Sequence, residues 1–160
     1  MENHSGRPAD WIEKTIKRYE NKLLRAAAAI MGGMAEAEDI VQDAFVKLIE
    51  KQPGFKSDEH EIAWLLRVTV NLCKSRLRSH QWKKTVPLLD DYPAQNNEQE
   101  SIIGEVLRLP AKYRTVIHLF YYEGYQVKEI AEITKQKEGT VREQLTRARR
   151  MLKEFYKGEL

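Results

Sequence analysis

Apolar residues recur along most of this chain at steps of three or four positions, which is the period of a helix with one buried face. Almost no run of strand length alternates apolar with polar residues, so the pattern predicts an all-α fold. Glycines at 32–33 and the Pro-Gly pair at 53–54 interrupt the first half. Between these breaks the pattern predicts three helices, Trp11 to about Met31, Ala35 to Lys51 and Glu61 to about His80.

The helical period is lost between Lys83 and Glu100. This stretch holds two of the five prolines and two adjacent asparagines, which do not favour a regular helix. We therefore expect two small helical domains, residues 1–82 and 101–160, joined by an acidic flexible linker, residues 83–100. Eighteen linker residues can reach at most about 60 Å, so the two domains can lie well apart. The composition of this segment is also typical of a plain solvated tether, with no binding role of its own.

The second predicted helix has one apolar and one acidic face. On a helical projection the inward residues are Ala37, Ile40, Val41, Ala44, Leu48 and Ile49. The opposite side, called the acidic stripe below, consists of Asp39, Gln42, Asp43, Val46 and Glu50. An exposed aliphatic residue among carboxylates suits a protein partner, but a solvated helix face gives the same pattern.

The third predicted helix presents chemistry that suits nucleic acid. Its inward residues are Ile62, Leu65, Thr69, Leu72 and Cys73. Its other side, called the ridge below, carries Trp64, Arg67, Asn71, Lys74 and Arg78. Cations neutralise phosphates, a Trp can stack on an unpaired base, and an Asn can read a base edge. Burial at a helix junction is the alternative for Trp64.

The C-terminal part predicts a helix-turn-helix. Val141, Leu145, Ala148 and Leu152 return to one face and can pack on Ile130, Ala131 and Ile133 of a preceding short helix. The residues left outward form what we call the recognition face: Thr140, Arg142, Glu143, Thr146, Arg147 and Arg150. In a helix-turn-helix the second helix enters the DNA major groove. Helical hairpins of other function also show this pattern.

Charge is distributed unevenly along the chain, although the net charge is only +3. Residues 67–84 hold six basic residues and no acidic ones, residues 85–100 hold four acidic and no basic ones, and residues 101–160 hold twelve Lys or Arg against eight Glu. Blocks of opposite sign therefore alternate along the chain, and this distribution is more informative than the net charge. A basic block is also typical of a solvated helix face.

Several classes of protein are disfavoured by what the sequence lacks. Cys73 is the only cysteine, so no internal disulfide can form, and the four histidines show no ligand spacing. The first ten residues lack the apolar core of a signal peptide, and no apolar run reaches membrane-spanning length. We therefore expect a cytoplasmic protein without metal, cofactor or direct membrane insertion. The exposed faces hold no convergent acid and base, so neither an enzyme nor a small-molecule substrate is expected.

Three segments resemble, in order, the regions of bacterial sigma factors of the extracytoplasmic-function type. Leu109 to Leu152 resembles their region 4, Ala35 to Glu50 looks like region 2.2, and Trp64 to Arg78 looks like regions 2.3 and 2.4. The resemblance covers nearly the whole chain and places a linker where that family has one. It implies a transcription initiation factor that binds core RNA polymerase, with an anti-sigma factor as a further partner.

The resemblance also implies a role for each surface. The acidic stripe would bind the clamp helices of the polymerase β' subunit, with Phe45 supporting that helix from the core side, and the β flap would be a second polymerase contact. The ridge would hold the melted -10 element of promoter DNA. Asn71 and the loop from Gly54 to Asp58, with Phe55, Lys56, Ser57 and Asp58, would accept a flipped base. The recognition face would read the -35 element.

Two alternatives and two departures accompany this interpretation. A dimeric helix-turn-helix regulator would leave the acidic stripe and the ridge unexplained. An enzyme acting on nucleic acid would lack a set of catalytic residues.

In the turn, the family usually has Gly, a small apolar residue and Ser, where this chain has Lys135, Gln136 and Lys137. Lys135 is therefore strained if its backbone is left-handed. Glu143 replaces a small polar residue, and it can either read a cytosine or orient a neighbouring arginine.

Overall fold

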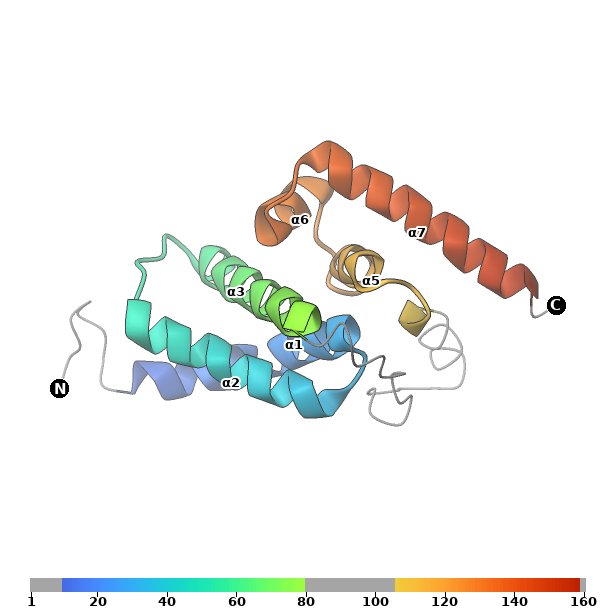
Figure 1. Cartoon of the computed structure of the whole chain (residues 1–160). Coiled ribbons are helices and arrows are strands. Elements are labelled where there is room, and N and C mark those ends of the chain that lie inside the picture. The colour runs from blue at the N-terminus through green and yellow to red at the C-terminus, as the bar shows by residue number, and fades with distance from the viewer. Residues whose placement is uncertain (1–9, 80–105, 159–160) are drawn as a thin grey trace.

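The computed structural model describes residues 10–79 and 106–158, and within these ranges it is helical (Figure 1). This confirms the predicted all-α class. The elements, in chain order, are α1 (Trp11–Met31), α2 (Met34–Lys51), α3 (Asp58–Ser79), α5 (Ala111–Ile117), the π-helical turn η2 (His118–Tyr122), α6 (Val127–Thr134) and α7 (Glu138–Gly158). The predicted linker, residues 83–100, lies outside the described residues.

The ends of α1, α2 and α3 follow from local sequence signals. Gly32 ends α1 in the left-handed conformation, with φ of 84°, and its N–H donates to the carbonyl of Ala28. The start of α3 differs from the prediction, because the helix begins at Asp58 and not at Glu61. The Ser57 hydroxyl accepts a hydrogen bond from the N–H of His60 at 3.1 Å, which caps the three additional residues.

The first three helices form one bundle, with a core centred on Leu23, Ile40, Leu48, Leu65 and Leu66, each no more than 1% exposed. The predicted inward faces of α2 and α3 are buried or half-buried apart from Ile49, whose prediction was wrong. Ile49 is 45% exposed because it lies at the edge of the apolar face, where it lines an open groove between α1 and α2.

The remaining helices form a second bundle that buries, among others, Leu119, Ile130, Val141, Leu145 and Ala148. This confirms the predicted inward face of the last helix for Val141, Leu145 and Ala148, whereas Leu152 is half-buried. α6 and α7 make the helix-turn-helix, and α5 with η2 packs beneath them (Figure 1). A capping box begins α6, in which Gln126 N–H donates to Glu129 Oε1 at 2.9 Å.

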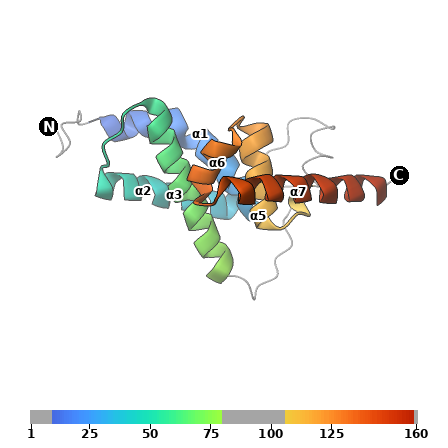
Figure 2. The same cartoon turned by 90° about the horizontal axis from the view of Figure 1, so that it is seen from above.

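The two bundles pack against each other, which the sequence pattern did not predict. α6 lies beside α3, and α5 lies beside the end of α1, in both views of the molecule (Figures 1 and 2). Arg114 of α5 is only 7% exposed and donates through Nε to the carbonyl of Ala29 at 3.0 Å and through Nη2 to that of Ile30. A basic side chain of the second bundle therefore caps the C-terminal end of α1.

Candidate nucleic-acid and protein interfaces

The acidic stripe lies on the surface of α2. Asp39, Gln42, Asp43, Val46 and Glu50 are all exposed, and Phe45 is buried on the core side of the same helix. Arg76 of α3 approaches two of the carboxylates, at 3.9 Å from Asp39 and 3.8 Å from Asp43. Because exposed ion pairs contribute only about 0–1 kcal/mol, both carboxylates can exchange Arg76 for another cationic partner.

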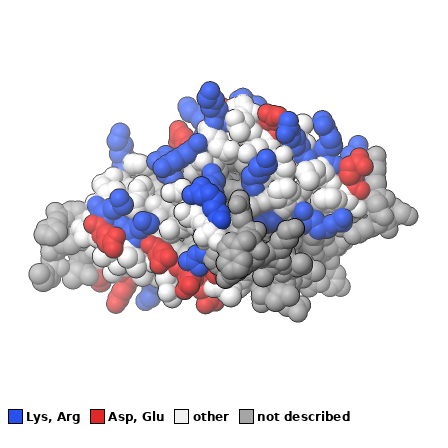
Figure 3. Space-filling model, in the orientation of Figure 1, with Lys and Arg blue, Asp and Glu red and all other residues white. Residues whose placement is uncertain are grey.

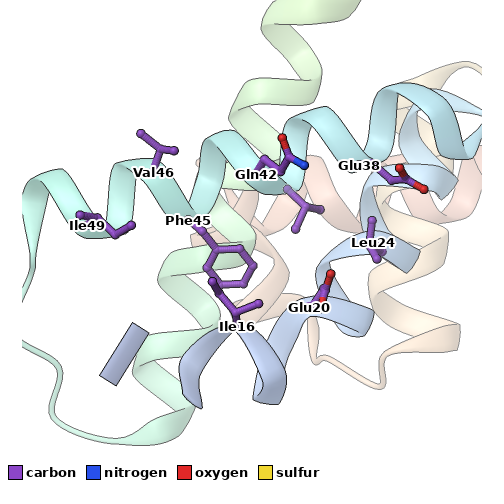
Figure 4. Close-up of a pocket in the computed structure, with 9 residues that line it drawn as sticks. Ile16, Glu20, Leu24, Glu38, Gln42, Phe45, Val46 and Ile49 are labelled. Carbon is purple, nitrogen blue, oxygen red and sulfur yellow. The ribbon is translucent and has the colours of Figure 1, made fainter. Parts of the chain in front are cut away.

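An apolar groove of about 610 Å³ runs beside the acidic stripe, between α1 and α2 (Figure 4). Figure 4 shows Phe45 reaching from α2 toward Ile16 on α1. Glu20 and Glu38 place carboxylates at the rim. The other lining residues are Leu24, Val41, Gln42, Val46 and Ile49. The stripe and the groove together form one continuous surface on which an apolar segment with basic flanks can bind.

The ridge on α3 is partly exposed and partly engaged within the chain. Arg67, Asn71 and Arg78 are exposed, whereas Trp64 and Lys74 are half-buried. Trp64 packs edge-on against Phe55, with ring centroids 5.8 Å apart, so the structure places it at a helix junction. This packing is the alternative that the sequence raised for Trp64.

Two cations of the ridge donate hydrogen bonds to the second bundle. Arg67 Nε donates to the carbonyl of Glu132 and Lys74 Nζ to that of Thr134, each at 3.2 Å. Burial lowers the pKa of Lys74, and the nearby charges of Arg78 and Lys135 lower it further. Part of the predicted nucleic-acid surface is therefore already occupied by α6.

The loop before α3 has structural as well as candidate binding roles. Phe55 is half-buried, whereas Lys56, Ser57 and Asp58 are exposed. Ser57 caps α3, and Asp58 accepts a hydrogen bond from Arg18 of α1 at 3.2 Å. These contacts hold the loop beside the N-terminal half of α3, two turns or more from Asn71 along the helix.

The recognition face is exposed along α7, as the sequence predicts for all six of its residues. Figure 3 shows Lys and Arg side chains gathered over α6 and the start of α7, and acidic side chains over α2. Glu143 Oε1 lies 2.6 Å from Arg147 Nη2, and Glu138 Oε1 lies 3.3 Å from Arg142 Nη2. Each pair joins residues one helical turn apart, so two of the basic side chains are oriented by acidic neighbours.

The turn between α6 and α7 has the strained backbone that the sequence raised as a possibility. Lys135 has φ of 56° and ψ of 46°, in the left-handed region, and its N–H donates to the carbonyl of Ala131. The two Gln side chains at 136 and 144 then pair amide to amide, at 3.1 and 2.8 Å. This reciprocal pair ties the turn to α7 and fixes the angle between the two helices.

The sequence pattern did not predict the contacts of three structurally important residues: Arg114, Gln136 and Gln144. Arg114 lies in α5 two residues after the exposed Lys112, and nothing in that local sequence marks one basic residue as buried and the other as exposed. The two glutamines are eight residues apart, one in the turn and one on α7, so no helical spacing connects them. Only the tertiary structure brings them together.

A first prediction concerns the turn. Replacing Lys135 by Gly should stabilise the second bundle by about 1 kcal/mol, because glycine adopts the left-handed conformation without the Cβ clash. Thermal unfolding should show a melting temperature higher by about 2–4 °C. Lys137→Gly is the control, because Lys137 does not have a positive φ. Glycine there adds freedom to the unfolded chain without relieving strain, so this variant should be less stable than the wild type. A lower melting temperature for Lys135→Gly would contradict this reading of the turn.

Family models and individual relatives identify the same protein family for this chain. Residues 15–83 match the family described as Sigma-70 region 2, and residues 99–152 match Sigma-70, region 4. The chain is 30% identical over 146 residues to the ECF RNA polymerase sigma factor SigM of Mycobacterium tuberculosis, covering 88% of this chain and 74% of SigM. It is 28% identical to SigW of Bacillus subtilis, covering 90% and 88%.

Two solved structures share the fold. One is the sigma factor RpoE in complex with the anti-sigma factor NepR from Bartonella quintana, with a TM-score of 0.78 and 24% identity, covering 93% of this chain and 98% of that one. The other is CnrH in complex with the cytosolic domain of CnrY, with a TM-score of 0.70 and 22% identity, covering 98% and 93%. Within residues 10–79 and 106–158, no helix combines the length and apolar character needed to cross a bilayer.

Proposed function

The chain belongs to the extracytoplasmic-function sigma factors of the sigma-70 family, and from this premise we propose which of its surfaces meet polymerase and promoter DNA. A sigma factor is not an enzyme; it binds core RNA polymerase and directs it to promoters. We assign residues 1–82 to region 2, residues 83–100 to the linker and residues 101–160 to region 4. The exposed acidic stripe beside an apolar groove is the observation that carries the polymerase assignment.

Region 2 divides into a polymerase-binding and a DNA-binding side. The acidic stripe binds the clamp helices of the β' subunit, with Asp39 and Asp43 exchanging Arg76 for polymerase cations. The ridge on α3 and the loop 55–58 bind the melted -10 element. Asn71, exposed on α3, holds a base that has left the stack, which costs a few kcal/mol and must be offset by contacts to that base.

Region 4 reads the -35 element as duplex DNA. The recognition face is the exposed side of a helix whose opposite side is buried, as a helix in the major groove requires. Arg142, Arg147 and Arg150 supply cations for base edges and phosphates. The β flap of polymerase is the proposed partner that positions region 4 over this element.

An anti-sigma factor is the proposed inhibitor of this chain. RpoE and CnrH are each described in complex with such a partner, and both share the fold of this chain. The groove between α1 and α2, with an apolar floor and two Glu at its rim, suits an amphipathic helix with basic flanks. Such a helix would cover the same surface as the polymerase clamp and would therefore compete with it.

A second prediction concerns Glu143 and the two roles open to it. Direct readout of a cytosine would make Glu143→Ala lose about 1–3 kcal/mol of discrimination at one base pair. The close ion pair with Arg147 supports an orienting role instead. We therefore expect a uniform loss of affinity over all -35 sequences and a salt slope shallower by about one, because Arg147 is no longer held toward a phosphate.

The measurement uses holoenzyme on a panel of single-base -35 variants at two salt concentrations. Glu154→Ala, at an exposed position on the same helix, is the control for removal of one negative charge. A loss confined to one base pair would reject the orienting role and establish direct readout.

A further inference from the structure

Two glutamine side chains join the turn of the helix-turn-helix to the helix that carries the recognition face. Gln136 lies in the turn 135–137 and Gln144 lies on α7, and their amide groups donate to each other at 3.1 and 2.8 Å. We propose that this pair, called the amide clasp below, sets the angle at which α7 meets the major groove and thereby determines base discrimination at the -35 element. The inference rests on the proposed function of region 4.

The amide clasp continues a set of hydrogen bonds that begins in α6. The Thr134 hydroxyl, in a residue only 3% exposed, donates to the carbonyl of Ile130 at 2.7 Å and accepts from Gln136 Nε2 at 2.9 Å. The backbone N–H of Gln136 donates to the carbonyl of Ala131 at 2.9 Å. Gln136 is therefore fixed to α6 through its backbone and its side chain. Its bonds to Gln144 then hold α7 relative to α6.

Apolar packing alone leaves the angle between these helices less well defined. Ile130 and Ile133 of α6 and Val141 and Leu145 of α7 are buried in one apolar cluster. Helices that pack through such side chains cross at angles that scatter by about 15–20° around the preferred values. Hydrogen bonds are directional, so the two bonds of the clasp restrict the angle further. Both glutamines are half-buried, which strengthens these bonds relative to exposed ones.

A small change in this angle is enough to disturb base contacts. Arg147 of the recognition face lies six residues after Val141, which is about 9 Å along the helix axis. A tilt of about 10° around the start of α7 would therefore move the backbone at Arg147 by about 1.6 Å. Hydrogen bonds to base edges tolerate only about 0.5 Å of variation in length. Contacts to phosphates carry no sequence information, so such a tilt should reduce discrimination more than affinity.

Neither glutamine belongs to the recognition face, so both are positioning residues. The test replaces their amides by leucine, which has nearly the same size but cannot donate or accept hydrogen bonds. The variants are Gln136→Leu, Gln144→Leu and the combination of both. Each single change leaves one amide without its partner and should lower the melting temperature. The double variant should recover most of this loss, because two leucines can pack against each other.

The matched control is Ile117→Val, which removes one methylene group from a buried side chain of α5. It should destabilise region 4 without changing the clasp. Circular dichroism verifies that all the proteins keep their helices, and thermal unfolding compares their stabilities.

The measurement is the base preference of holoenzyme, which is bound to promoter fragments randomised at the -35 element and then recovered for sequencing. Wild type and control should prefer the same bases by the same factors, because a less stable domain binds every sequence less in equal proportion. Each single leucine variant should lose about tenfold of its preference at one or more base pairs, which is the contribution of one bidentate base contact.

The double variant separates orientation from stability. Its base preference should stay as low as that of the single variants although its stability recovers, because packed leucines do not fix the orientation of α7. Discrimination that returns together with stability would overturn the role of the amides. Losses that multiply in the double variant would show that the two residues act separately, and would overturn the clasp as a unit.

Two further outcomes separate this inference from the proposed function beneath it. A wild type that discriminates at the -35 element, with single variants that do so equally well, would overturn the clasp and leave the function of region 4 intact. A wild-type holoenzyme without any base preference at that element would remove the proposed function of region 4, and this inference with it.

Discussion

Replacing Asp39 and Asp43 by Lys should remove binding to core RNA polymerase while leaving the fold intact. Both side chains are exposed, at 70% and 56%, so the helices do not depend on them. At an interface with cations of the polymerase, two reversed charges should cost about 3 kcal/mol or more, which is a hundredfold or greater loss of affinity. Fluorescence titration of labelled chain with purified core measures this loss.

The control for this prediction is Glu13→Lys with Glu154→Lys. These residues are exposed and lie on other helices, and the substitutions change the net charge by the same amount. The control should bind core with wild-type affinity, and both double variants should unfold at temperatures close to that of the wild type. Equal affinity of both variants for core would show that the acidic stripe is not the polymerase contact.

Replacing Asn71 by Ala should separate promoter opening from promoter recognition. If the amide holds an extruded base, its loss removes hydrogen bonds that stabilise the melted state, about 1–3 kcal/mol or roughly five- to hundredfold. Transcription from duplex promoters should fall by this factor. A template already melted over its non-critical positions should be affected less, because part of the cost of strand separation has been removed.

The matched control is Ser75→Ala, one turn further along the exposed side of α3. It should transcribe both templates as the wild type does. An equal loss on duplex and premelted templates, or no loss on either, would remove the base-holding role from Asn71.

The helices and their faces were predictable because burial imposes a period that any single helix records in its own sequence. The acidic stripe, the exposed part of the ridge and the recognition face all lie where the projection placed them. The two wrong predictions concern a residue at the edge of an apolar face and the first residue of a helix. Ile49 lies at the margin of an apolar face beside an open groove, and the Ser57 cap extended α3 beyond its apolar pattern.

The contacts between distant segments were not predictable from this one sequence. Arg114 reaches carbonyls 84 and 85 positions earlier in the chain, and the ridge cations reach carbonyls 60 and 65 positions later. Backbone carbonyls are present at every residue, so no residue type marks such an acceptor. The sequence predicted strain at Lys135 only if its backbone is left-handed. Whether it is left-handed depends on how α6 and α7 pack.

Run-off transcription with purified core polymerase tests the central claim most directly. The chain should direct core to a small set of start sites on genomic DNA, each preceded by a common pair of -10 and -35 elements, and core alone should not use these sites. The same start sites should be lost with the Asp39→Lys and Asp43→Lys variant and kept with its control. Transcription unchanged by the chain, together with unaided binding of a dimer to palindromic duplex DNA, would contradict the account.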